Sequence, residues 1–374
     1  MKDSAGSVQS QALFVWRKSY TIGLITGLLG LAAAHPAAAS TQAIPTSERN
    51  VLLELYGSTN GAAWANNSGW LGASGTECSW YGVSCVYSGR CTPSAKRSAQ
   101  CPVHISAIGL NLNDLDGVLE TVDLDALPYL TDFEAEGDNL YGSIPDFSLT
   151  ALRTFKVNNN FLSGPIPVLT WNTSLQDFEA SINFLSGSIP SLSGLSDLQT
   201  FDVHDNRLTG SIPTLSTLYS LQTFDTFNNG LTGLIPPLTG LAELRTFEVS
   251  ANHLTGSLPN PSGLTKLSVF HTSTNELTGS IPELVNLPEL TSFDVSANQL
   301  TGGVPNLYGL NALRELIIDV NKLSGFMPAP PPLGQQLEPG KSFLCPNKLI
   351  AGYSMAWDTA TGVTPWYETC LPGK

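Results

Sequence analysis

Apolar and polar residues recur with one fixed period through most of the chain. The unit LQTFDVHDNRLTGSIP, from Leu198 to Pro213, shows the order: a Leu, an alternating segment, an Asn, a second Leu and a Gly. The Asn returns every 23 residues, at Asn160, Asn183, Asn206, Asn229, Asn252, Asn275, Asn298 and Asn321. Weaker units centred on Asn113 and Asp138 bring the total to ten. A repeat of this length predicts a solenoid of stacked coils.

The alternating segment of each unit predicts a short strand with one buried face. Strands that recur at this period can stack in parallel, about 4.8 Å apart, into one long sheet. The Phe five residues before the repeated Asn then forms a buried column of Phe133, Phe155, Phe178, Phe201, Phe224, Phe247, Phe270 and Phe293. Each buried ring contributes roughly 1.5–3 kcal/mol, so we interpret the column as core.

The repeated Asn residues, from Asn113 to Asn321, predict a structural ladder along the edge of this sheet. An Asn where a strand ends can hydrogen-bond the neighbouring backbone groups that the strand leaves unpaired. Asp138 can accept such hydrogen bonds but cannot donate them, so we expect its coil to be less regular. Because a single coil cannot bury its own apolar edges, the solenoid needs a cap at each end.

The first 39 residues have the features of a secretory signal peptide. Arg17 and Lys18 precede an apolar stretch at residues 22–34, and Ala37-Ala38-Ala39 forms a cleavage signal before Ser40. A transmembrane helix needs about 20 apolar residues, so an uncleaved anchor is the less favoured alternative. We therefore expect an exported protein, secreted to the extracellular space or periplasmic, without membrane insertion after cleavage.

All six cysteines follow this segment, which favours disulfides in an oxidising compartment. Cys345 and Cys370 are expected to pair near the C-terminus. Three connectivities are possible for the other four, and the local pairs Cys78–Cys85 and Cys91–Cys101 are favoured because short loops close most easily. No cysteine has the spacing of a zinc site, so we expect no metal.

The unit N-x-L-T-G-S-I-P-x-L-x-x-L closely resembles the plant-type extracellular leucine-rich repeat of polygalacturonase-inhibiting proteins and receptor-kinase ectodomains. The resemblance extends to the N-terminal cap of that family. It is carried by the segment from Glu48 to Tyr56, by Trp64 and Trp70, and by the sequence CSWYGVSC that ends at Cys85. The resemblance covers about residues 45–328. It implies an α/β repeat solenoid, a right-handed leucine-rich-repeat superhelix with a parallel concave β-sheet, about ten coils and disulfide-bonded caps at both ends. The Ala-rich signal indicates a bacterial secreted member.

Four segments follow from these features. They are a signal peptide at residues 1–39, an N-terminal cap with disulfides at 40–102, the leucine-rich-repeat solenoid at 103–328 and a C-terminal cap with a disulfide at 329–374.

The charge balance narrows the range of partners. The chain has 17 basic and 31 acidic side chains and a net charge of -14, which disfavours nucleic acid and anionic membranes as partners. Carboxylates dominate the position four residues before each repeated Asn, which should face outward on the concave sheet. The acidic surface predicts a basic protein or peptide partner. The alternative is that these carboxylates are only the solvated residues of the repeat.

Three residues that differ from those usual at their repeat position are added to the candidate binding site. His204, Phe227 and His271 stand where small or acidic residues are usual, and an exposed aromatic ring is a common binding anchor. The candidate ligand-binding residues on the concave face are Lys156, Glu179, Asp202, His204, Asp225, Phe227, Glu248 and His271. Lys156 could pair with Glu134 or Glu179.

These features predict a monomeric recognition protein and not an enzyme. The sequence holds no nucleophile elbow, phosphate-binding loop or metalloprotease motif, and it implies no cofactor. The resemblance also implies an inhibitor of a secreted hydrolase as one alternative. A structural protein that binds glycans or the cell envelope is another, although neutral glycans usually need stacked exposed aromatic rings, which the repeat pattern does not show.

Overall fold

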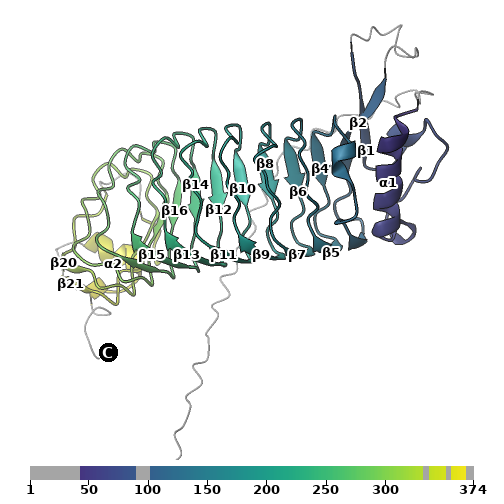
Figure 1. Ribbon diagram of the computed structural model, residues 1–374. Helices are drawn as coiled ribbons and strands as arrows, with labels where there is room; N and C mark the ends of the chain where they lie inside the picture. Colours follow the sequence, from purple (N-terminus) through teal and green to yellow (C-terminus); the bar gives the residue numbers. More distant parts are fainter. Residues whose placement is uncertain (1–42, 90–101, 332–336, 351–354, 368–374) are drawn as a thin grey trace, which may run out of the picture. The chain divides into compact units, whose positions relative to one another are not determined.

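The computed structural model describes residues 43–89, 102–331, 337–350 and 355–367, and Figure 1 shows how their elements are arranged. The predicted signal peptide, Cys91, Cys101 and Cys370 lie outside the described residues. Two sheets of stacked strands make up the repeat region, and the α-helices lie at its two ends. The chain therefore has the predicted leucine-rich-repeat solenoid fold.

The larger sheet has eleven strands, one from each coil together with one from the N-terminal cap. Every neighbouring pair is parallel except the antiparallel pair β1 and β2. In spatial order the strands are β1 (Val83–Tyr87), β2 (Val103–Gly109), β4 (Asp132–Glu134), β6 (Thr154–Lys156), β8 (Asp177–Glu179), β10 (Thr200–Asp202), β12 (Thr223–Asp225), β14 (Thr246–Glu248), β16 (Val269–His271), β18 (Ser292–Asp294) and β19 (Glu315–Ile317).

The predicted Phe column is confirmed as the centre of the core. Equivalent residues pair in register, as Phe201 does with Phe224, and the rings stack with centroids 5.7 Å apart and planes inclined by 16°. All eight rings are at most 1% exposed. Because each ring contacts the ring of the next coil, the column joins neighbouring coils into one continuous core.

A second sheet, which the repeat pattern did not predict, follows the repeated Asn residues. Its eight strands are parallel and come from consecutive coils. They are β17 (Glu276–Thr278), β15 (His253–Ser257), β13 (Gly230–Leu234), β11 (Arg207–Gly210), β9 (Phe184–Ser188), β7 (Phe161–Gly164), β5 (Asn139–Ser143) and β3 (Asp116–Val118). In every strand of this sheet except β3 the repeated Leu is buried and its neighbours on either side face outward, as around Leu208.

The Asn ladder forms as the repeat predicted from Asn160 to Asn321, whereas Asn113 bonds Asn66 of the cap and Asp138 is an irregular rung. The Nδ2 of Asn183 donates to the carbonyl oxygens of Val157, Ala180 and Ser181 at 3.0, 3.3 and 3.0 Å, and its Oδ1 accepts from the Leu162 amide at 2.9 Å. Asp138 keeps the accepting half of this pattern, but its buried Oδ2 has no hydrogen-bond partner. Burial raises the pKa of this carboxyl.

The N-terminal cap joins a helix to the first coil. Helix α1 (Thr46–Ser58) places Glu48, which is 1% exposed, where it accepts from the Ile105 amide at 2.8 Å and pairs with His104 Nδ1 at 2.6 Å. Short 3₁₀ turns, η1 (Gly61–Ala63) and η2 (Glu77–Ser79), follow the helix, and a third, η3 (Leu124–Ala126), lies in the first coil. The Cys78–Cys85 disulfide closes the cap as predicted.

One further turn, which the 23-residue spacing did not predict, follows the last regular coil. Asn347 continues the ladder, because its Nδ2 donates to the carbonyls of Ile318 and Leu344 at 2.8 Å. Strand β21 (Lys348–Ile350) then pairs in parallel with β20 (Ser324–Phe326).

Helix α2 (Met355–Thr361) completes the described C-terminal part, with Trp357 fully buried. Trp366 is 2% exposed, so the cap buries two large rings, as expected of a segment that covers an apolar edge. Cys345 is disulfide-bonded, and its predicted partner, Cys370, lies outside the described residues. No helix in the described ranges has the length and apolar character needed to cross a bilayer.

Candidate functional site

The candidate site lies on the outward face of the larger sheet, where the strands from β4 to β18 each end in a polar residue. The parallel register places Glu179, Asp202, Asp225 and Glu248 side by side on β8, β10, β12 and β14. Neighbouring strands are about 4.8 Å apart, so four carboxylates follow one another at short distance. We call these four residues the acidic row. Lys156 borders it on β6 and His271 on β16.

At the centre of the acidic row, His204 is held between carboxylates. Its Nδ1 lies 2.6 Å from Asp202 Oδ1. Burial alone would lower the pKa of His204, but the hydrogen bond and charge of Asp202 outweigh it and raise that pKa to about 9. Burial, together with the charges of Asp202 and Glu248, raises the pKa of Asp225 to about 7. The acidic row therefore concentrates negative charge, and the neighbouring His204 neutralises only part of it.

This central group also has the donor types that a divalent metal ion uses. One atom each from Asp202, His204 and Asp225 lie within 4.8 Å of one another. However, the imidazole already hydrogen-bonds Asp202, and Asp225 Oδ1 accepts from the Phe227 amide at 2.9 Å. Because these contacts already engage His204 Nδ1 and Asp225 Oδ1, and acidic groups commonly cluster without an ion, we assign no metal to the group.

The two shifted groups predict that stability falls as the pH rises. The fold favours protonated Asp225, so that contribution is complete below its ordinary pKa of 3.8 and is lost as the pH rises through about 7. The fold also favours protonated His204, so its contribution is complete below 6.5 and is lost as the pH rises through about 9. We expect urea titrations to give an unfolding free energy about 2–4 kcal/mol lower at pH 9 than at pH 5.

The matched control for this prediction is Asp225→Asn, which cannot ionise. Its unfolding free energy should change less between pH 5 and 7 than that of the native chain, because the deprotonation of Asp225 is removed. Identical pH profiles for the two proteins would show that the fold does not raise the pKa of Asp225.

A second hydrogen-bonded chain crosses the strands beyond the acidic row. His271 Nδ1 lies 2.8 Å from Glu248 Oε2, and its Nε2 lies 2.8 Å from Ser292 Oγ. This spacing is that of a nucleophile relay, but Ser292 Oγ also donates to Glu315 at 3.1 Å. The Glu315 carboxylate and the His271 imidazole therefore both lie within hydrogen-bond distance of the one Ser292 hydroxyl. These contacts link Glu248, His271 and Ser292 across neighbouring strands and hold the Glu248 carboxylate in place.

The remaining predicted residues have ordinary partners. Lys156 pairs with Glu179 at 3.0 Å, which decides between the two partners that the sequence allowed. Phe227 is half-buried, so it is less exposed than a binding anchor was expected to be. Glu248 is only 9% exposed, and its Oε1 accepts from the Ser250 amide at 2.9 Å. Asp202 and Asp225 are thus more accessible members of the acidic row.

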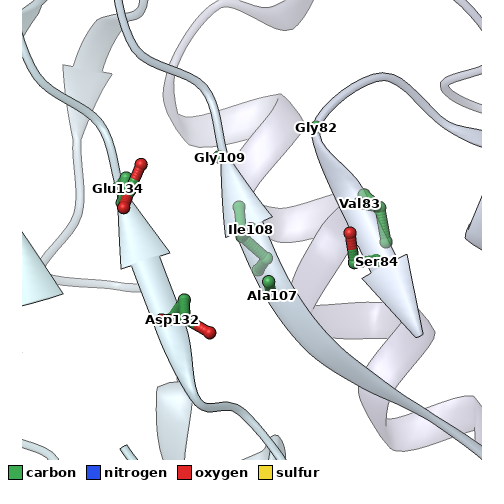
Figure 2. A pocket seen from close by; sticks show the side chains of 8 residues that line it. All are labelled: Gly82, Val83, Ser84, Ala107, Ile108, Gly109, Asp132 and Glu134. Carbon is green, nitrogen blue, oxygen red and sulfur yellow. The ribbon is translucent and has the colours of Figure 1, made fainter. Parts of the chain in front are cut away.

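The structure also shows a hollow that the sequence did not predict, at the N-terminal end of the same sheet (Figure 2). It measures about 320 Å³ and lies over β1, β2 and β4, where Ser84, Ala107 and Gly109 have small side chains or none. The carboxylates of Asp132 and Glu134 lie at its side on β4. Small residues in the outward positions of β2 were the signal for it. The hollow extends the acidic surface toward the N-terminal cap.

No protein-family model and no curated protein matches the chain. Solved structures do, and they share its leucine-rich-repeat fold. The plant peptide hormone receptor RGFR1 in complex with RGF2 is 34% identical over 57% of this chain and 36% of the receptor chain, with a TM-score of 0.56. The ectodomain of the Arabidopsis thaliana receptor kinase GASSHO1/SCHENGEN3, in complex with CASPARIAN STRIP INTEGRITY FACTOR 2, is 25% identical over 85% and 43%, with a TM-score of 0.60.

A third similar structure is close to this chain in length. A plant ice-binding protein is 24% identical over 78% of this chain and 91% of its own, with a TM-score of 0.59. The present chain therefore spans less than half of the length of the two receptor chains but matches nearly all of the ice-binding protein. Extracellular leucine-rich-repeat domains that bind ligands are thus the class of protein to which the chain is similar.

Proposed function

We propose that this chain is an exported, monomeric recognition protein that binds a basic protein or peptide through the acidic row. The observation that carries the proposal is the run of four carboxylates in register on neighbouring strands. Burial, together with the charges of Asp202 and Glu248, raises the pKa of Asp225 within this run to about 7. Like charges at strand spacing repel one another, and a cationic partner relieves that repulsion. The similar receptors that bind peptides are consistent with this use of the fold.

Several other features support export to the extracellular space or the periplasm. The Cys78–Cys85 disulfide requires an oxidising compartment, and the N-terminal 39 residues have the sequence of a signal peptide. The net charge of -14 adds long-range attraction for a basic partner, which speeds encounter at low salt.

A short peptide of alternating Arg and Gly should bind the native chain and bind Asp202→Asn/Asp225→Asn at least about tenfold more weakly. Affinity should fall with added salt, because the attraction is screened. It should rise between pH 6 and 8, because cation binding favours the ionised form of Asp225. Calorimetric titration of residues 40–374 measures all three effects.

The matched control is Glu276→Gln/Glu289→Gln, which removes the same charge from exposed positions outside the acidic row. It should keep nearly all of the native affinity. An equal loss in both variants would mean that only net charge attracts the peptide, and the proposal that the acidic row binds it would be wrong.

A second candidate function, the binding of ice, is favoured by a row of hydroxyls that follows the second sheet and continues past its last strand, β17. Side-chain hydroxyls occupy the same outward position in eight consecutive coils, at Ser163, Ser186, Thr209, Thr232, Thr255, Thr278, Thr301 and Ser324. Neighbours in this row share one orientation, since Thr209 and Thr232 both donate to the Gly carbonyl of the preceding coil, at 3.4 and 3.3 Å. A regular row of fixed hydroxyls can order water in a lattice.

Ice affinity predicts thermal hysteresis by the native chain that is lost when Thr232 and Thr255 are both replaced by Asp. The acidic-row variant Asp202→Asn/Asp225→Asn should keep it, because its changes lie on the other sheet. Absence of hysteresis from the native protein rejects this candidate.

A further inference from the structure

Two aromatic rings stand exposed at the start of neighbouring strands of the second sheet. Phe161 on β7 is 51% exposed, and Phe184 on β9 is 40% exposed. Their centroids are 6.1 Å apart, with planes inclined by 25°. The guanidinium of Arg207 lies 4.5 Å from the centroid of Phe184 and extends the stack onto β11. The three side chains form one continuous stack that runs from coil to coil.

The fold itself does not require aromatic residues at this position. The position directly after the ladder Asn holds Gly230, His253 and Glu276 in the next three coils, and the repeat continues unchanged. The next residue, the repeated Leu, supplies the apolar side chain that the core buries. Since exposed apolar surface is unfavourable at about 25 cal/mol per Å², clustered exposed rings mark a binding surface better than they mark a core.

A groove runs beside these rings. Its volume is about 470 Å³, and it extends across four coils, from Gly137 to Asp205. Phe161 and Phe184 line it together with Asn159 and Ile182, and ladder residues lie beneath them. We call this hollow the edge groove. Its elongated course along the coils suits a chain-like ligand that meets a similar set of groups at each coil.

The groups that line the edge groove define the chemistry of its ligand. In the described structure the side-chain amides of Asn139 and Asn159 make no hydrogen bonds, so each can both donate to and accept from a ligand hydroxyl. The described lining contains no Lys, Arg or His, and Asp205 already accepts from Asn228 Nδ2 at 2.5 Å. Apolar rings beside amides suit a molecule with C–H faces and hydroxyl edges. The carboxyl groups of Asp138 and Asp205 outnumber the one nearby cation, Arg207, so a polyanionic ligand is disfavoured.

We propose that the edge groove binds a neutral oligosaccharide. The sugar C–H groups would contact Phe161 and Phe184, and the ring hydroxyls would bond the Asn amides. This site lies apart from the acidic row, on the other sheet, so it would give the protein a second binding surface of different chemistry. The stacked rings of Phe161 and Phe184 also correct the expectation from the sequence that stacked exposed aromatic rings are lacking.

Titration calorimetry of residues 40–374 with cellohexaose and with mannohexaose tests the proposal, and an oligogalacturonide of equal length serves as the anionic comparison. We expect at least one neutral hexasaccharide to bind and the oligogalacturonide not to bind. Phe161→Ala/Phe184→Ala should weaken binding by at least about tenfold, because it removes the ring contacts. His253→Ala, at the equivalent position three coils after Phe184, should leave it unchanged.

The acidic-row variant Asp202→Asn/Asp225→Asn should also keep the sugar affinity, which separates this proposal from the proposed function. Circular dichroism establishes that each variant is folded. The proposal is overturned if neither neutral hexasaccharide binds at millimolar concentration, or if the double Phe variant binds as the native chain does. It is likewise overturned if the exposed rings prove to be needed only for a protein ligand.

Discussion

Replacing Phe224 with Ala should lower the free energy of unfolding by about 3–5 kcal/mol. The ring is fully buried, and its centroid lies 5.7 Å from that of Phe201 and 5.8 Å from that of Phe247. Each coil contacts only its neighbours, so a cavity in the middle of the column weakens two interfaces at once. Urea denaturation followed by circular dichroism measures the loss.

The same deletion on the surface provides the control. Phe161→Ala removes an equal number of atoms from a ring that is 51% exposed, and it should cost less than about 1 kcal/mol. If Phe224→Ala were no more destabilising than Phe161→Ala, the column would not be the main core of the solenoid.

Changing Asn183 to Asp should destabilise the chain by about 1–3 kcal/mol at neutral pH. Three carbonyl oxygens would lose the amide that donates to them, and a carboxylate oxygen would face them instead. A buried carboxyl in that place has a raised pKa, as Asp138 has. Its protonation at low pH restores a donor, so the loss should be smaller near pH 4 than near pH 8. Thermal unfolding at both pH values measures the difference.

The reverse change, Asp138→Asn, should stabilise the chain by a similar amount. Asp138 already makes the two accepting contacts of a ladder Asn. In Asp138→Asn, an NH2 group that can donate to the backbone carbonyls would replace Oδ2, which has no hydrogen-bond partner. Its gain should grow as the pH rises, because the native carboxyl is then ionised. A loss of stability in Asp138→Asn would contradict the interpretation that the ladder needs a donor in every coil.

The features of the fold that depend on the strict period could be predicted from sequence. The Phe column and the Asn ladder follow from one position each, repeated at a constant interval, and both form as expected. The second sheet was missed because only three to five residues after each Asn alternate, which is too short a pattern to distinguish a strand from a turn. The turn at Asn347 was missed because it lies 26 residues after Asn321.

The candidate site could be predicted in part. Equal spacing along the chain implies equal register, so the adjacency of Glu179, Asp202, Asp225 and Glu248 was foreseeable. The partner of Lys156 was not, because both neighbouring strands offer a carboxylate at the same register.

Exposure was the harder property to foresee. Alternation states which face of the sheet a side chain is on, but the depth to which neighbours cover it depends on packing between coils. Phe227 is half-buried for this reason, whereas Phe161 and Phe184, outside the predicted strands, are exposed. The signal that could have found them was a pair of aromatic residues in a position that is otherwise polar or Gly.

The most direct test of the central claim is to locate a bound cationic peptide on the protein. The Arg-Gly peptide, carrying a benzophenone group, would be irradiated with the native chain, and the cross-linked residues identified by mass spectrometry. The account predicts cross-links on the outward residues of β8, β10, β12 and β14, near Asp202 and Asp225, and their loss in Asp202→Asn/Asp225→Asn. Cross-links confined to the second sheet or to the caps would contradict it.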